Sequence, residues 1–170
     1  PVAADEVDVA VAGLVLSFLP DLPAALAELR RVVDDGGTIA AYVWDYAGKM
    51  EFMRIFWDTA VALDAGAAQL DEGVRSPLCR AGALETLFAG AGLEDIAVRA
   101  IDVATQFENF DDYWQPFLGG QGPAPTYVMS LDEAARARLH DHIRGRITIA
   151  ENGSIALTAR AWAARASVLE

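Results

Sequence analysis

Residues 8–46 constrain the fold most, because they read as a strand, a helix, a turn and a second strand joined by short connections. The run VDVAVA at 7–12 is small and β-branched without polar alternation. That pattern is typical of a strand buried on both faces of a parallel sheet. A second such run, TIAAYVW, occupies 38–44. A strand, a crossover helix and a second strand of this length predict a right-handed βαβ unit and therefore an α/β fold.

The crossover between the two runs is predicted to be a helix. Asp21 is a suitable N-cap, and Pro23 lies in the first turn, where a missing N–H group costs nothing. Apolar residues then recur at helical spacing over 22–33. Gly36 and Gly37 are predicted to end this helix, because glycine accepts the left-handed conformation of a C-cap.

The rest of the chain is also predicted to contain both helices and strands. Ser130 with Glu133 three residues later forms the capping box predicted for the last helix. The two late strands, with much chain between them, predict an antiparallel pair that carries an insertion. Helices are predicted at 48–65, 80–91 and 131–147, a short helix and a Gly/Pro-rich loop at 109–125, and strands at 93–107 and 153–168.

Composition narrows the function classes. Hydrophobic residues make up 54% of the 170 residues, and the net charge is −12, which disfavours nucleic acid and anionic membranes as partners. The apolar run at 9–20 is too short to span a bilayer. The single cysteine, Cys79, excludes a disulfide framework, fits a reducing cytoplasm and is read as a buried residue. His140 and His142 point to different helix faces, so no metal site is predicted.

The order of these segments resembles the second half of class I S-adenosylmethionine-dependent methyltransferases. The likeness is carried by GLVLSFLPD at 13–21, by ALAELRRVV at 25–33 and by the GGT turn that leads into a strand with an aromatic end. LETLFAGAGLEDIAVRAI at 84–101 is similar to the family's late helix and sixth strand. The resemblance implies a partial Rossmann-like fold, S-adenosylmethionine as cofactor and a small-molecule acceptor. It assigns 1–108 and 150–170 to the sheet core with its helices, and 109–149 to an insertion.

One family feature is absent from the sequence. The 170 residues contain no acidic-x-Gly-x-Gly-x-Gly loop, which in the family follows the first strand and holds the cofactor. We therefore expect the chain to be the C-terminal part of a methyltransferase domain, and to be inactive alone. A non-catalytic interaction module derived from this fold is the alternative. A Rossmann-like reductase is a third option, and the DDGGT turn favours the methyltransferase over it.

Site residues follow from the strand ends, because ligands in open α/β sheets lie beyond the carboxyl ends of the strands. The resemblance implies that Gly13, Leu14 and Val15 border the methionine part of the cofactor. Trp44 and Tyr46 are candidates for the acceptor pocket, and Asp45 is the candidate general base, with a core Trp and a solvated Asp as the alternative.

The insertion supplies further candidates for the acceptor site. Tyr113, Trp114 and Phe117 either line the acceptor pocket or form a packing cluster over the sheet. Gly119, Gly120 and Gly122 are candidates for the hinge of a lid.

The first strand is expected to lack a neighbour on one side, since the family's first three strands have no counterpart in the sequence. An open apolar edge at residues 7–15 predicts self-association.

Overall fold

The computed structural model describes residues 2–80 and 82–169, and the chain divides into two compact units. The first unit comprises Pro1–Asp45, Pro77–Ile101 and Arg160–Glu170. The second comprises Tyr46–Ser76 and Asp102–Ala159, and it contains the whole predicted insertion at 109–149. Residues 1, 81 and 170, which the predicted domain and the predicted helix at 80–91 include, lie outside the described residues.

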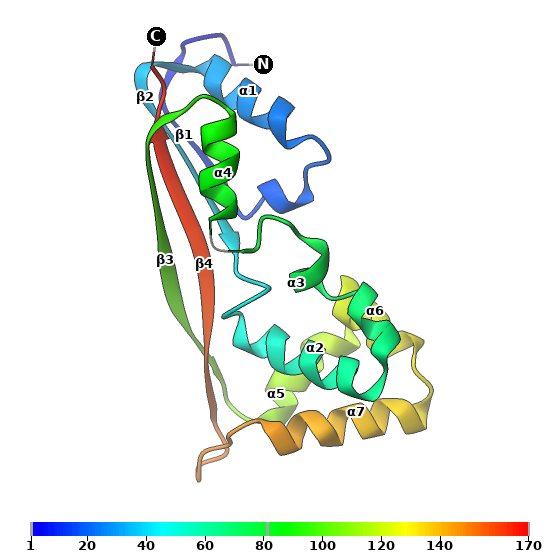
Figure 1. Cartoon of the computed structure of the whole chain (residues 1–170). Coiled ribbons are helices and arrows are strands. Elements are labelled where there is room, and N and C mark those ends of the chain that lie inside the picture. Colours follow the sequence, from blue (N-terminus) through cyan, green and yellow to red (C-terminus); the bar gives the residue numbers. More distant parts are fainter. Residues whose placement is uncertain (1, 81, 170) are drawn as a thin grey trace. The chain divides into compact units, whose positions relative to one another are not determined.

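The first unit is built on a sheet with strand order β1-β2-β4-β3 (Figure 1). β1 (Val7–Gly13) runs parallel to β2 (Val33–Trp44), with Ala10 opposite Ile39 and Gly13 opposite Tyr42. β4 (Ile155–Ser167) runs antiparallel to β2. The predicted βαβ unit and the α/β class are confirmed.

β3 (Glu94–Phe107) is the edge strand beside β4. Asp95, near the start of β3, borders the same small pocket as Arg165 and Ser167, near the end of β4. The two neighbours therefore run in opposite directions, as the sequence predicts for the last two strands.

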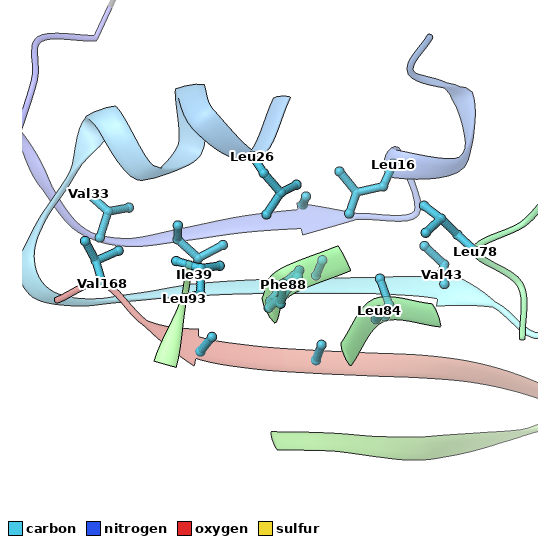
Figure 2. Packing of buried hydrophobic residues seen from close by; sticks show 14 of the residues in the cluster. Leu16, Leu26, Val33, Ile39, Val43, Leu78, Leu84, Phe88, Leu93 and Val168 are labelled. Carbon is cyan, nitrogen blue, oxygen red and sulfur yellow. The ribbon is translucent and has the colours of Figure 1, made fainter. Parts of the chain in front are cut away.

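Two helices cover one face of this sheet. α1 (Leu22–Val32) and α4 (Ala83–Gly90) lie on the same side of the strands in Figure 1. Figure 2 shows the buried side chains that converge between the helices and the strands, with Leu26 from α1, Phe88 from α4 and Ile39 from β2. These three side chains are at most 1% exposed, so they form the centre of the first unit's core.

On the other face of the sheet the side chains of β1 are exposed, which corrects the prediction that 7–12 is buried on both faces. Val9 is 56% exposed and Val11 is 60% exposed, whereas Ala12 on the helix-covered face is buried. The sequence pattern correctly predicts a strand. A β-branched run does not, however, indicate whether helices cover both faces of the sheet.

The start of α1 is confirmed, and its predicted end is wrong. Asp21 caps the helix by accepting a hydrogen bond from the Ala24 N–H at 2.9 Å. The helix ends at Val32, and Gly36 and Gly37 belong to β2. Gly36 does adopt a positive φ of 78°, but it does so where the chain bends within β2, and its N–H donates to the Val168 carbonyl at 2.8 Å.

The second unit is helical around an aromatic core. Phe56 of α2 stacks on Phe117 at a ring distance of 4.4 Å, and Phe52 meets Tyr113 edge-on. No helix in residues 2–80 or 82–169 combines the length and apolar character that crossing a membrane requires. The helices of this unit are α2 (Glu51–Leu63), α3 (Glu72–Arg75), α5 (Phe110–Trp114), α6 (Pro123–Ser130) and α7 (Glu133–Arg146).

The predicted cap of α7 is wrong by two residues. Asp132 is the N-cap and accepts a hydrogen bond from the Ala135 N–H at 2.7 Å. Ser130 is the last residue of α6, where its hydroxyl donates to the Tyr127 carbonyl. Aspartate and serine are nearly equal as N-caps, so the end of the preceding helix decided between them.

Candidate functional site

The carboxyl ends of β1 and β2 meet at one end of the sheet. The two strands are parallel neighbours, and the Leu14 N–H donates to the Tyr42 carbonyl at 2.9 Å just past the end of β1. In open α/β sheets this end is where ligands bind. Gly13, Leu14 and Val15 therefore lie at the same end of the sheet as Trp44 and Asp45, within the first unit.

Gly13 has no side chain, and the Tyr42 side chain of the protein itself lies close to its backbone. The Tyr42 hydroxyl lies directly over the Gly13 Cα, so that a methyl group on Gly13 would overlap it. Tyr42 is 39% exposed and lies on the face of the sheet opposite α1 and α4. A ligand at Gly13 would thus meet the Tyr42 hydroxyl first.

Leu14 has an unusual backbone. Its φ is +56°, a left-handed conformation that non-glycine residues rarely adopt. The hydrogen bond to Tyr42 fixes this conformation, and the chain then enters a short 3-10 turn, Leu16–Phe18. Strained residues of this kind cluster at functional sites, so the turn after β1 is a site candidate on structural grounds as well.

Asp45 is more enclosed than a surface carboxylate. It is 5% exposed, and its N–H donates to the Arg160 carbonyl at 2.9 Å. This burial contradicts the alternative of a solvated Asp. Trp44, one residue earlier, is half-buried and pairs with Ala161 of β4.

The remaining predicted residues belong to the second unit. Tyr46 is half-buried, and its carbonyl accepts a hydrogen bond from Arg54 at 2.9 Å. Tyr113, Trp114 and Phe117 are 0%, 7% and 2% exposed, respectively, inside the aromatic core. The Tyr113 hydroxyl donates to the Phe52 carbonyl at 2.7 Å, and burial raises the pKa of this hydroxyl. In this conformation the three side chains pack the core, and their predicted contact with an acceptor stays a prediction.

The glycines predicted to hinge a lid lie in an exposed loop. Gly120 and Gly122 have positive φ values of 71° and 86°, and Gly122 directly precedes α6. Gly119 adopts an ordinary helical conformation at the end of a 3-10 turn. The backbone thus requires glycine at two of the three positions, and the hinge itself stays a prediction.

A charged cluster fixes the start of the second unit. Arg54 donates to both carboxylate oxygens of Asp71, at 2.9 and 2.7 Å, and also to the exposed Asp58 at 3.0 Å. Burial opposes the charge of Arg54, but the hydrogen bonds and charge of Asp71 outweigh it and raise the pKa of the guanidinium. The cluster joins α2 to the segment that leads into α3, so its role is structural.

Cys79, His140 and His142 are the residues considered for thiol or metal chemistry, and the structure shows the surroundings of each. Cys79 is fully buried, as predicted. His142 is exposed, whereas His140 lies half-buried against Phe110 and Trp114. Within residues 2–80 and 82–169, no group of His, Cys, Asp and Glu side chains is placed to hold a metal ion.

Tyr42 lies at the candidate site and was not among the residues predicted from the sequence. Its position in TIAAYVW contains the signal, because residues 38, 40, 42 and 44 share one face of the strand. What the pattern does not contain is the register that sets Tyr42 opposite Gly13.

Comparisons with known proteins bear on the family and the fold of the chain. Residues 1–41 match a family model described as "Methyltransferase domain". No curated protein matches the chain.

Solved structures resemble the whole chain at low sequence identity. A putative type II methyltransferase from Anaeromyxobacter dehalogenans is 19% identical with a TM-score of 0.58, and the match covers 99% of this chain and 67% of that one. A putative methyltransferase from Bacillus halodurans is 11% identical with a TM-score of 0.53, and the match covers 100% and 68%. The chain thus spans about two thirds of their length. The resemblance to the class I S-adenosylmethionine-dependent methyltransferases is therefore confirmed, in sequence over residues 1–41 and in fold over the whole chain.

Proposed function

We propose that the chain serves the transfer of a methyl group from S-adenosylmethionine to a small-molecule acceptor. The observation that carries this proposal is that the 41 residues matching the methyltransferase model build β1, α1 and most of β2. The same residues include the turn at Gly13–Val15, where Leu14 is held in its left-handed conformation. The family match and the structural site candidate thus fall on one stretch of chain.

The strand ends fit part of the cofactor. Gly13 and Val15 are exposed, and the Tyr42 hydroxyl lies against Gly13, which suits the short, flexible methionine portion. Bound S-adenosylmethionine supplies an electrophilic methyl group on a sulfonium. No residue is assigned to the adenosine portion, because the glycine-rich loop that holds it in the family is absent from the sequence. We therefore propose that these 170 residues alone are inactive.

The chain's own contribution to chemistry would come from the end of β2. Methyl transfer needs the acceptor held in line with the methyl group, and often a base that takes the acceptor's proton. Asp45 is the candidate base, and Trp44 and Tyr46 flank it in the sequence as candidates for the acceptor wall. The negative net charge favours a small acceptor over a nucleic acid. The single buried thiol fits the proposed cytoplasmic location.

Nuclear magnetic resonance of the ¹⁵N-labelled chain tests the proposed function. We expect millimolar S-adenosylhomocysteine to shift the amide signals of residues 13–16 and 44–45 without reaching saturation, because the strand ends contact only its amino-acid portion. The Glu85 amide, on the exposed side of α4, is the internal control and should not move. NADPH is the comparison ligand. If NADPH shifts the strand-end signals and S-adenosylhomocysteine does not, the reductase option replaces the methyltransferase.

The alternative of a non-catalytic interaction module is favoured by one observation. β1 is an edge strand, and its side chains Val9 and Val11 are more than half exposed. Exposed apolar edge strands are templates for pairing with another chain. We propose that the chain self-associates through the edge at residues 7–15.

Self-association has a measurable signature in sedimentation velocity. We expect concentration-dependent association that increases with salt, because salt screens the repulsion between chains of charge −12. Val11→Lys should make the chain monomeric, since a lysine on an edge strand opposes pairing. Val74→Lys is the matched control, because Val74 is also 60% exposed but lies in α3. A wild-type chain that remains monomeric at every concentration would rule out this association.

A further inference from the structure

A groove lies between α1 and α4 on the helix-covered side of the first unit (Figure 1). Its volume is about 410 Å³, within the range of roughly 300–1,000 Å³ that is usual for small-molecule sites. From Pro23 to Arg30, α1 rises by about 10 Å, so the groove has room for a small organic molecule along its length. α1 contributes Pro23, Leu26, Ala27 and Arg30 to the lining, and α4 contributes Leu87 and Gly90.

Gly90 leaves space in the α4 wall of the groove. It is the last residue of α4, and its φ is not positive, so the backbone does not require glycine there. A Cβ at this position would meet nothing within 4 Å apart from its own helix and chain neighbours, so no close neighbour requires glycine either. Glycine is nevertheless a poorer helix former than alanine. The missing side chain therefore keeps the groove open at a position where the fold would accept a larger residue.

Arg30 brings a positive charge to this otherwise mostly apolar lining. Its Nη1 donates to the carbonyls of Ala91 and Gly92 at 3.1 and 3.4 Å, and its Nη2 donates to the Leu169 carbonyl at 3.4 Å. These bonds use three of the five N–H donors of the guanidinium and leave the Nε–H and one Nη2–H. Within the described part of the chain, no carboxylate forms an ion pair with Arg30. The groove thus offers a cation with two unused donors.

We propose that the groove between α1 and α4 binds a small monocarboxylate with an apolar body. The Nε–H and the unused Nη2–H of Arg30 belong to neighbouring nitrogens of one planar guanidinium, and a carboxylate accepts two such parallel hydrogen bonds. The apolar body of the ligand lies along Leu26 and Leu87 and fills the space beside Gly90. The groove residues do not include the strand ends, so this inference does not depend on the proposed methyl transfer.

Octanoate and octanamide provide the test, because they share an apolar chain and differ in the charge of the head group. Each is titrated into the ¹⁵N-labelled chain and followed by nuclear magnetic resonance. We expect octanoate to shift the amide signals of Ala27, Arg30, Leu87 and Ala91 saturably. Octanamide should bind at least about tenfold more weakly, because it cannot form the charge-assisted pair with Arg30.

Filling the groove locates the binding. Gly90→Leu places a side chain in the empty space and should abolish the octanoate shifts. Gly145→Leu is the matched control, because Gly145 is also an exposed helical glycine with nothing within 4 Å of an added Cβ, but it lies in α7 of the second unit. It should bind octanoate like the wild type. Ala27→Leu narrows the groove from the α1 side and should also abolish binding, so the test does not depend on one variant folding.

Arg30→Lys tests the head-group contact separately. It keeps the charge but not the planar fork, so octanoate should bind about tenfold more weakly while the affinity for octanamide stays unchanged. Absence of saturable shifts with octanoate in the wild type would overturn the proposal. Equal affinity for octanoate and octanamide would also overturn it, because Arg30 would then not select a carboxylate. Octanoate binding that survives in folded Gly90→Leu or Ala27→Leu would show that the ligand lies elsewhere.

Discussion

Replacing Phe88 by alanine is expected to lower the free energy of unfolding by about 3–5 kcal/mol, because a fully buried phenylalanine leaves both its transfer energy and a cavity behind. Phe88 is 0% exposed, and its ring lies between α4 and the strands in Figure 2. The cluster around it joins α1, β2 and α4 into one core. A loss of this size is a large part of the ordinary stability of a small domain.

Urea unfolding followed by tryptophan fluorescence measures the effect of Phe88→Ala, since Trp44 and Trp162 report on the first unit. Phe18→Ala is the matched control. Phe18 is 76% exposed, so its removal should change the free energy of unfolding by less than about 0.5 kcal/mol. Equal effects of the two substitutions would mean that the first unit is not packed around Phe88.

Arg54→Ala is the second substitution with a large expected effect, about 2–4 kcal/mol of destabilisation. Asp71 is 5% exposed, and Arg54 contacts both of its carboxylate oxygens. Removing Arg54 leaves that carboxylate buried without its cation, although Gly73 still donates its N–H to Asp71 at 2.8 Å. Arg54→Lys should recover only part of the loss, because an ammonium cannot contact both oxygens in the planar fork geometry of a guanidinium.

Asp58→Ala allows the buried Arg54–Asp71 pair to be compared with an ordinary surface ion pair, Arg54–Asp58. Arg54 also contacts Asp58 at 3.0 Å, but the Asp58 side chain is 57% exposed, so its removal should cost less than about 0.5 kcal/mol. The fluorescence of Trp57 and Trp114, both in the second unit, reports the transition. The double variant Arg54→Ala/Asp71→Ala should be more stable than the sum of the two single losses predicts. Strict additivity would show that the two residues do not interact.

The local elements were predictable because their signals are local. Asp21 and Pro23 mark the start of α1, and the runs at 7–12 and 38–44 mark parallel strands. The end of α1 was not predictable, since Val33 continues directly into β2 and the glycines act inside the strand. A glycine pair signals a bend in the chain without saying which element contains it.

The site was predictable only to the level of strand ends. The topology rule places Gly13, Leu14 and Asp45 at one end of the sheet, because β1 and β2 are parallel neighbours. The contact of Tyr42 with Gly13 depends on strand register, and the left-handed Leu14 has no sequence signal. The second unit depends on contacts such as Phe56 with Phe117, which lie too far apart in sequence for a periodic pattern to reveal.

We propose that these 170 residues contain the strand ends of a methyltransferase site without the loop that holds the adenosine of the cofactor. Calorimetric titration of S-adenosylmethionine and S-adenosylhomocysteine into the chain, up to millimolar ligand, tests this claim most directly. We predict no saturable heat for either ligand, since the strand ends contact only the methionine portion. Saturable binding at micromolar ligand would contradict the account, because it would mean that residues 12–15 and 44–46 complete a cofactor site by themselves or in an oligomer.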